Sequence, residues 1–200
     1  MSSDRRIGTE TSATRAALVA ATEEIMLEDG YAAVTSRRVA ARAGLKAQLV
    51  HYYFRTMDDL FLALHRTRVE QGLERQAQAL AADQPLWALW DTSRDPRGTA
   101  LTMEFIALAN HRKVIRAEIA SSAERFRAAQ LEGLEVVLER YGVDPDDWTP
   151  IVCTVLMSSI SRFLVMEFET LGMSSGHAET VAFVERYIRK VEGERRCPAQ

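Results

Sequence analysis

Basic side chains gather without any carboxylate in one stretch of the chain, residues 31–57. This stretch holds five cations and no Asp or Glu: Arg37, Arg38, Arg42, Lys46 and Arg55. The whole chain of 200 residues has a formal net charge of −3, so the residues outside the stretch carry −8. Guanidinium and ammonium groups bind phosphate, whereas carboxylates among them would repel it. The pattern therefore predicts a polyanion partner that contacts one end of the protein only.

Two short helices, at about 36–43 and 46–52, are expected to position these cations. Thr35 is a suitable N-cap for the first helix, and Gly44 can adopt the left-handed conformation that ends it. Two short helices joined by such a turn have the form of a helix-turn-helix, whose second helix can enter a major groove. The capped start of the first helix offers backbone N–H groups and a positive dipole end to a phosphate.

Apolar residues recur at helical spacing along the chain, which predicts an all-α protein of about nine helices. Gly30 is expected to end the first helix, and Thr56 and Asp59 form a capping box at the start of the fourth. The expected inner stripe of the first helix is Leu18, Ala21, Ile25 and Met26. The expected helices are at about 14–28, 36–43, 46–52, 57–82, 85–93, 97–110, 112–141, 147–171 and 178–192.

Composition and motifs exclude several classes of function. The chain is 47% hydrophobic and can bury a core, and neither a membrane span nor a signal peptide is expected. Cys153 and Cys197 form no CxxC pair and have no His at metal-ligand spacing. We therefore expect a reduced, cytoplasmic protein with no metal and no cofactor. No HExxH, GxSxG, P-loop or GxGxxG motif occurs, so no enzymatic activity is expected.

The segment TRAALVAATEEIMLEDGYAAVTSRRVAARAGLKAQLVHYYFRTMDDLFLAL resembles the DNA-binding region of the TetR (tetracycline-repressor) family. The resemblance covers about 50 residues, a quarter of the chain, and AGL followed by YF-x-T is its most specific part. The landmarks at family spacing are Leu18, Ala21, Gly30, Tyr31, Thr35, Val39, Ala40, Ala43, Gly44, Leu45, Tyr53, Phe54 and Leu60. It implies a homodimeric transcriptional regulator, usually a repressor, that binds a palindromic double-stranded DNA operator and is released by a small molecule.

The resemblance also implies which residues contact DNA. The start of the first helix of the pair would bind phosphate, with Arg37 also near a base. The start of the second helix would face the groove, and His51 and Tyr53 would brace phosphates. The predicted DNA-binding residues are Thr35, Ser36, Arg37, Lys46, Ala47, Gln48, Leu49, His51, Tyr52, Tyr53 and Arg55. For the remaining two cations, Arg38 and Arg42, the sequence leaves open a phosphate contact or a solvated position.

This chain departs from the family pattern at five positions. Lys46, Gln48 and Leu49 predict a different operator, because Lys can pair with guanine, Gln with adenine and Leu with a thymine methyl. His51 replaces a frequent Tyr. Met57 stands where a phosphate-binding Lys is frequent, so one backbone contact is expected to be missing unless a neighbouring cation such as Arg55 replaces it.

The resemblance divides the chain into four parts. These are a flexible N-terminal arm (1–13), a helix-turn-helix DNA-binding domain (14–57), a helical ligand-binding and dimerisation domain (58–192) and a flexible tail (193–200). Arg5 and Arg6 could form a minor-groove arm, or the terminus could be disordered.

The C-terminal part is expected to dimerise. Residues 147–171 are apolar nearly all round, so one side needs the monomer core and the other a partner subunit. The resemblance implies that the last two long helices pair with their symmetry mates. The predicted interface residues are Val181, Val184, Tyr187 and Ile188.

A ligand pocket is expected between the long fourth helix and the segments after it, and it would take a small hydrophobic effector. The residues expected to line it are Trp87, Trp90, Met103, Phe105, Met157, Arg162 and Phe163. Arg162 lies within an apolar helix and needs an explanation. It could pair with Glu104, Glu118 or Glu167, anchor an acidic ligand, or face outward.

A helical protein-interaction adaptor without DNA binding is the alternative function. An adaptor would also need a dimer surface, but it would not need a stretch free of carboxylates.

Overall fold

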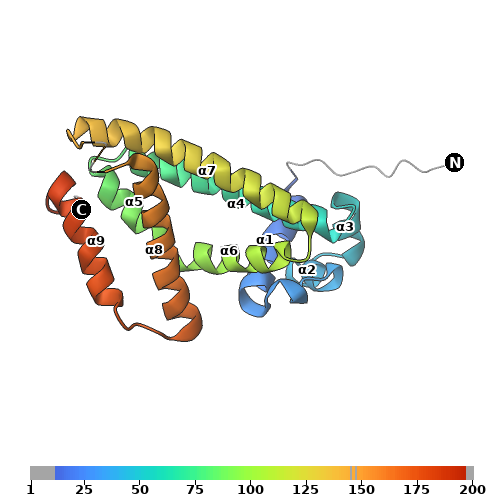
Figure 1. Cartoon of the computed structure of the whole chain (residues 1–200). Coiled ribbons are helices and arrows are strands. Elements are labelled where there is room, and N and C mark those ends of the chain that lie inside the picture. Colours follow the sequence, from blue (N-terminus) through green and yellow to red (C-terminus); the bar gives the residue numbers. More distant parts are fainter. Residues whose placement is uncertain (1–11, 145, 147, 197–200) are drawn as a thin grey trace. The chain divides into compact units, whose positions relative to one another are not determined.

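The computed structural model describes residues 12–144, 146 and 148–196, and this part of the chain is all-α, as predicted (Figure 1). Arg5, Arg6, Cys197 and most of the predicted N-terminal arm lie outside the described residues, as does the end of the predicted tail. Each predicted helix is present with its ends shifted by at most a few residues, and a short 3₁₀ helix follows the first. The helices are α1 Ala13–Asp29, η1 Tyr31–Ala33, α2 Ser36–Arg42, α3 Ala47–Tyr53, α4 Met57–Leu80, α5 Pro85–Ser93, α6 Pro96–Ala109, α7 Lys113–Arg140, α8 Pro150–Leu171 and α9 His177–Glu192.

The packing divides the chain into two compact units. The first comprises the described residues up to Glu70 together with Ala100–Ser122, and the second comprises Gln71–Thr99 together with the described residues from Ala123 onward. Helices α4, α6 and α7 therefore contribute residues to both units. Each unit has its own apolar core.

The core of the first unit is built from α1 to α4 with parts of α6 and α7. The predicted stripe of α1 is buried, which confirms the period of its apolar residues. The side chains with at most 1% of their surface exposed include Leu18, Ile25, Met26, Val39, Val50, Leu60 and Leu64. Burial of α2 and α3 in this way fixes which faces of the two short helices remain outside.

Local capping sets the ends of the short helices. The Thr35 hydroxyl accepts the backbone N–H of Arg38 at 3.3 Å, and Gly44 has φ +67, so both predictions are confirmed. The start of α3 differs by one residue, because Lys46 is its N-cap and makes no capping bond. A lysine ammonium has donors only and cannot accept a backbone N–H.

The capping box that opens α4 is also confirmed. The Thr56 backbone N–H donates to Asp59 at 3.0 Å, and the Asp59 N–H donates to the Thr56 hydroxyl at 3.1 Å. This reciprocal pair fixes where the chain leaves α3 and enters α4.

In the second unit, a buried carboxylate joins the end of α9 to α5. Glu192 is 9% exposed and accepts the backbone N–H groups of Leu86 and Trp87 at 3.0 and 2.9 Å. Its Oε1 also accepts the Tyr141 hydroxyl at 2.8 Å. Because these N–H groups open α5, Glu192 acts as a cap supplied from a distant part of the chain. We call this arrangement the Glu192 clasp.

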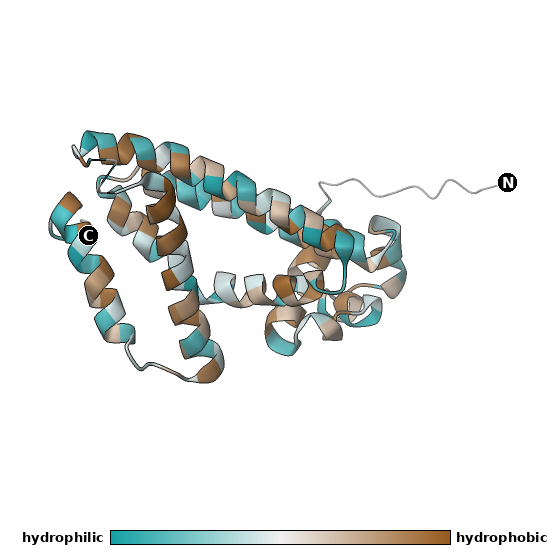
Figure 2. Ribbon diagram, in the orientation of Figure 1, coloured by the Kyte–Doolittle hydropathy of each residue, from teal (hydrophilic) through white to brown (hydrophobic). Residues whose placement is uncertain are grey.

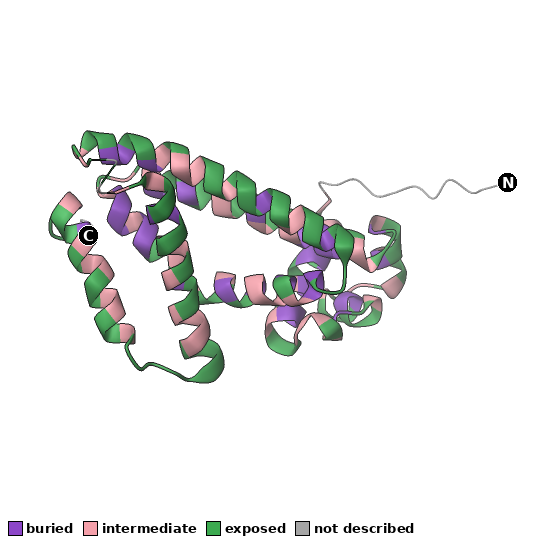
Figure 3. Cartoon of the chain, in the orientation of Figure 1, coloured by how far each residue is buried: buried purple, intermediate pink, exposed green. Residues whose placement is uncertain are grey.

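Helix α8 leaves much of its apolar surface uncovered. Figure 2 shows hydrophobic residues along α8, and Figure 3 shows that most of the helix is exposed or half-buried. By length and composition α8 could cross a membrane, with 17% of the apolar stretch buried. No span is expected from the sequence, because no segment holds 18 apolar residues in a row. One helix of this kind is weak evidence for a membrane span, since helices that pack in soluble proteins pass the same test.

Candidate nucleic-acid interface

Three cations in or beside α2 and α3 are free of ion pairs within the part of the chain that the structure describes. Arg37 lies in the first turn of α2, Lys46 caps α3, and Arg55 follows α3. All three side chains are exposed. They are therefore available to bind phosphate, as the sequence predicted from residue type alone.

The other two cations of the stretch are neutralised by α1. Arg38 pairs with Asp29, and Arg42 donates to both oxygens of Glu28 and to Glu24 at 3.3 Å. The Arg42 hydrogen bonds lower the pKa of the Glu28 carboxyl. The sequence left open a phosphate contact or a solvated position for these two cations, and the structure shows neither but ion pairs within the protein. The carboxylates come from a helix that packs beside α2, outside the local stretch.

A sequence signal for this pairing exists in α1. Glu24 and Glu28 are four residues apart and lie on one helix face. An acidic face on a helix that must pack beside α2 could have indicated that some of the basic residues are used within the protein.

The first turn of α3 presents one clearly exposed polar side chain, Gln48. Ala47 and Leu49 are half-buried, and Ala47 packs against the core of the first unit. Among the residues that follow, His51 and Tyr52 are exposed. An amide offers both a donor and an acceptor to a base edge, so Gln48 is the residue of α3 best suited to read sequence.

Tyr52 and Tyr53 differ in their surroundings although they are neighbours. Tyr53 is half-buried and packs against the core of the first unit, whereas Tyr52 is 39% exposed. The two rings meet edge to face with centroids 5.0 Å apart. The core contact gives Tyr53 a fixed ring from which its hydroxyl can reach outward.

The start of α2 combines capping with a possible anion contact. Thr35 uses a lone pair to accept the Arg38 N–H, so its hydroxyl proton stays free to donate. Ser36 is half-buried in the first turn. Hydroxyl donors beside the positive end of a helix dipole suit a phosphate oxygen.

The residues predicted to line a ligand pocket do not share one cavity. Trp87 and Trp90 are buried in the core of the second unit, and Phe105 is buried in the core of the first. Met103 of α6 is half-buried, while Arg162 and Phe163 of α8 are exposed.

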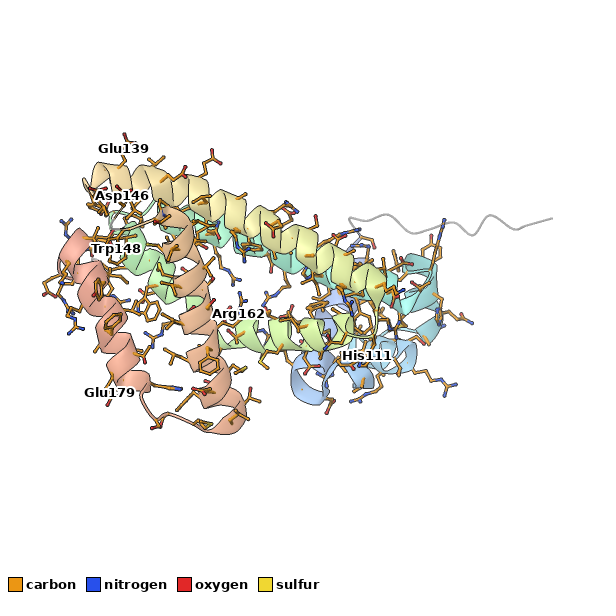
Figure 4. The ribbon with its side chains drawn as sticks, in the orientation of Figure 1. His111, Glu139, Asp146, Trp148, Arg162 and Glu179 are labelled. Carbon is orange, nitrogen blue, oxygen red and sulfur yellow. The ribbon has the colours of Figure 1, made fainter. Side chains whose placement is uncertain are left out.

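An apolar cavity of about 340 Å³ lies in the second unit among α5, α7, α8 and α9. Met157 lines it, as do three of the predicted interface residues, Val184, Tyr187 and Ile188. Trp148, labelled in Figure 4, also lines it. Its other lining residues are Leu86, Leu134, Leu138, Thr149, Val152, Cys153, Leu156, Ile160 and Phe183. Burial raises the pKa of the Cys153 thiol, which therefore packs here as a neutral, apolar group.

Arg162 forms no ion pair with any described residue, and Figure 4 shows its place on α8. The three carboxylates considered as partners bind other groups. Glu104 accepts the Tyr31 backbone N–H at 2.7 Å, Glu118 pairs with Arg66, and Glu167 lies 2.9 Å from His177 Nε2. Of the three possibilities that the sequence left open for Arg162, pairing with one of these acids is not found among the described residues, and the exposed side chain faces outward instead.

The segment that contains α2 and α3 matches a known protein family. Residues 18–64 match the family described as bacterial regulatory proteins, tetR family. This match covers α1 from Leu18 onward, all of α2 and α3, and the start of α4. A search of curated protein sequences found no match.

Solved structures share the fold over most of the chain. A TetR transcription regulator from Haloarcula marismortui is 20% identical with a TM-score of 0.72, covering 89% of this chain and 97% of that one. A transcriptional regulator from Rhodococcus sp. Rha1 is 20% identical with a TM-score of 0.69, covering 91% and 99%. A protein from Saccharomonospora viridis, solved in complex with choline, is 17% identical with a TM-score of 0.74, covering 90% and 98%.

Proposed function

We propose a specific role for this chain on the premise that it belongs to the TetR family of bacterial regulatory proteins. It is accordingly a DNA-binding transcriptional regulator and not an enzyme. The proposed role is that of a cytoplasmic repressor, which binds a palindromic operator as a homodimer and is released by a small hydrophobic effector.

The DNA-binding part rests on three exposed cations that form no ion pair with any described residue: Arg37 in α2, Lys46 at the start of α3 and Arg55 just after α3. We assign phosphate contacts to Arg37, Arg55 and the hydroxyls of Thr35 and Ser36 at the start of α2, whereas Lys46 faces the groove with the start of α3. Base contacts are assigned to the start of α3, with Gln48 as the main reader. His51, Tyr52 and Tyr53 complete the set on the second half of α3.

We propose two functional domains, with residues 14–57 for DNA binding and residues 58–192 for ligand binding and dimerisation. The packing units follow a different boundary, because the first core also takes in α4 up to Glu70 and Ala100–Ser122. Because these helices run through both units, we propose that they transmit the effect of a bound ligand to the DNA-binding helices α2 and α3.

The dimer is proposed to form through α8 and α9. Uncovered apolar side chains on α8 support this, with Leu156 52%, Phe163 54% and Phe168 57% exposed. Among the predicted α9 residues, Ile188 is only 4% exposed and belongs to the protomer core. Val181, Val184 and Tyr187 are half-buried, and their exposed neighbour Phe183 would extend the interface.

An apolar effector is favoured over a cationic one by the arrangement of rings beside the cavity. The protein from Saccharomonospora viridis binds choline, and choline is usually held in an open cage of aromatic faces. Here the Phe183 and Tyr187 centroids are 4.8 Å apart and those of Trp148 and Tyr187 are 5.5 Å apart. Rings in direct contact leave no room for an ammonium group between them, whereas the apolar walls of the cavity suit a small hydrophobic molecule.

Selection of bound duplexes from random DNA, followed by salt titration, tests the proposed function. We expect a palindrome whose affinity falls steeply as salt rises. Arg37→Ala should reduce the slope of log K against log salt by about 0.9 per subunit, because one phosphate contact is lost. Arg42→Ala is the matched control and should keep the slope, since two carboxylates already neutralise Arg42. An adaptor would select no palindrome, and that outcome would remove the DNA-binding proposal.

The dimer has its own test. Phe168→Glu on α8, at a residue that does not line the cavity, should shift the protein toward monomer in analytical ultracentrifugation, because it places a charge in an apolar interface. Val136→Glu on α7, at a residue 64% exposed, is the control and should leave the mass unchanged. If both variants stay dimeric, α8 does not form the interface.

A further inference from the structure

Arg15 of α1 lies at the C-terminal end of α3. Its guanidinium carbon is 5.1 Å from the centre of the Phe54 ring, and Phe54 is the C-cap of α3. Its backbone N–H donates to the Ser12 hydroxyl at 3.1 Å, which fixes the first turn of α1. Because Phe54 is only 3% exposed, the ring is a firm platform for the guanidinium.

Arg15 is charged and has no acidic partner within the described residues, unlike the other arginines that contact α1. Arg38, Arg42 and Arg68 each pair with a carboxylate from the second half of α1. The first half, residues 13–22, holds no Asp or Glu. The half of α1 that holds Arg15 is thus free of carboxylates, like residues 31–57.

The two carboxylates at the start of α4 form no ion pair with Arg15 either. Asp58 pairs with Arg112, and Asp59 accepts the Thr56 N–H in the capping box. Met57, which opens α4, packs against the core of the first unit and offers no charge. The exposed cation nearest in sequence to Phe54 is Arg55, so two guanidiniums that pair with no described carboxylate lie beside this residue.

We propose that Arg15 binds a backbone phosphate of the operator beside the end of α3, as a contact supplied by α1. This inference rests on the proposed DNA binding and adds a residue to it. A half-buried guanidinium held over an aromatic ring loses little side-chain entropy on binding, and its outer N–H groups match phosphate oxygens. A phosphate contact positions the protein on the duplex and does not read bases.

The test uses the full-length protein and its selected operator, with Arg15→Met and Arg15→Lys. Met keeps an apolar chain over Phe54 but removes the charge, so log K against log salt should become shallower by about 0.9 per subunit, or about 1.8 per dimer. Over a fourfold rise in salt, the wild-type affinity should then fall about twelve-fold further than that of Arg15→Met. Arg15→Lys should restore the wild-type slope.

Three readouts separate the outcomes. An unchanged slope in Arg15→Met overturns the proposal, and an unchanged slope together with a lowered melting temperature identifies Arg15 as purely structural. If Arg37→Ala flattens the slope and Arg15→Met does not, the DNA-binding proposal stands and this inference fails. If the wild-type protein binds no duplex at low salt, both fail together.

Discussion

Removal of the Glu192 clasp by a single substitution should lower the free energy of unfolding of the second unit substantially. Glu192→Ala leaves two buried backbone N–H groups, those of Leu86 and Trp87, without an acceptor, and it frees the Tyr141 hydroxyl. A buried donor left unsatisfied costs about 1–3 kcal/mol, whereas the half-buried Tyr141 can turn to water. We therefore expect a loss of about 2–4 kcal/mol. For a chain of this length, that corresponds to a fall in melting temperature of roughly 4–16 °C.

Tryptophan fluorescence is the suitable assay, because all three tryptophans, Trp87, Trp90 and Trp148, lie in the second unit. Glu192→Gln should lose roughly half as much, since its amide keeps one acceptor oxygen for the two N–H groups. Glu194→Ala is the matched control two residues away, where the side chain is 80% exposed and pairs only with Arg189. Its effect should stay within about 0.5 kcal/mol. A Glu192→Ala melting temperature equal to that of the control would refute the capping role.

Three further predictions concern the first unit. Gly44→Ala should lower the free energy of unfolding, measured in urea, by about 1–2 kcal/mol. The added Cβ would meet nothing within 4 Å, so the cost comes from the positive φ of +67. An unchanged free energy would show that the turn can adopt another backbone conformation. Burial lowers the pKa of His65, so the unfolded chain binds a proton more readily. The free energy of unfolding should therefore decline as the pH falls below about 6.5, and His65→Gln should flatten that decline in pH-dependent melts. Gln48→Ala should change base preference in repeated selection more than it changes overall affinity, and equal losses on every sequence would contradict its reading role.

Much of the local structure could be predicted because its causes lie close together in sequence. The Thr35 cap, the Gly44 turn and the Thr56–Asp59 capping box each involve residues at most a few positions apart. The apolar stripe of α1 follows from the helical period in the same way. Such signals do not depend on where the rest of the chain packs.

The lining of the apolar cavity could not be predicted residue by residue. Aromatic residues such as Trp90 and Phe105 suit either a cavity wall or a packed core, and the packing of neighbouring helices decides between them. The Glu192 clasp could not be predicted from the sequence either, since Glu192 caps a helix more than 100 residues away in the chain.

By itself the sequence determined that a basic helix-turn-helix stands near the amino end of an all-α chain, because residue type, caps and periodicity act over one or two helical turns. The tertiary structure alone decided which of its cations remain available. Arg38 and Arg42 are neutralised because α1 packs with Asp29, Glu24 and Glu28 against them, whereas Arg37, Lys46 and Arg55 have no carboxylate within reach among the described residues. A Coulomb interaction depends on distance in space, and the packing of the helices sets that distance.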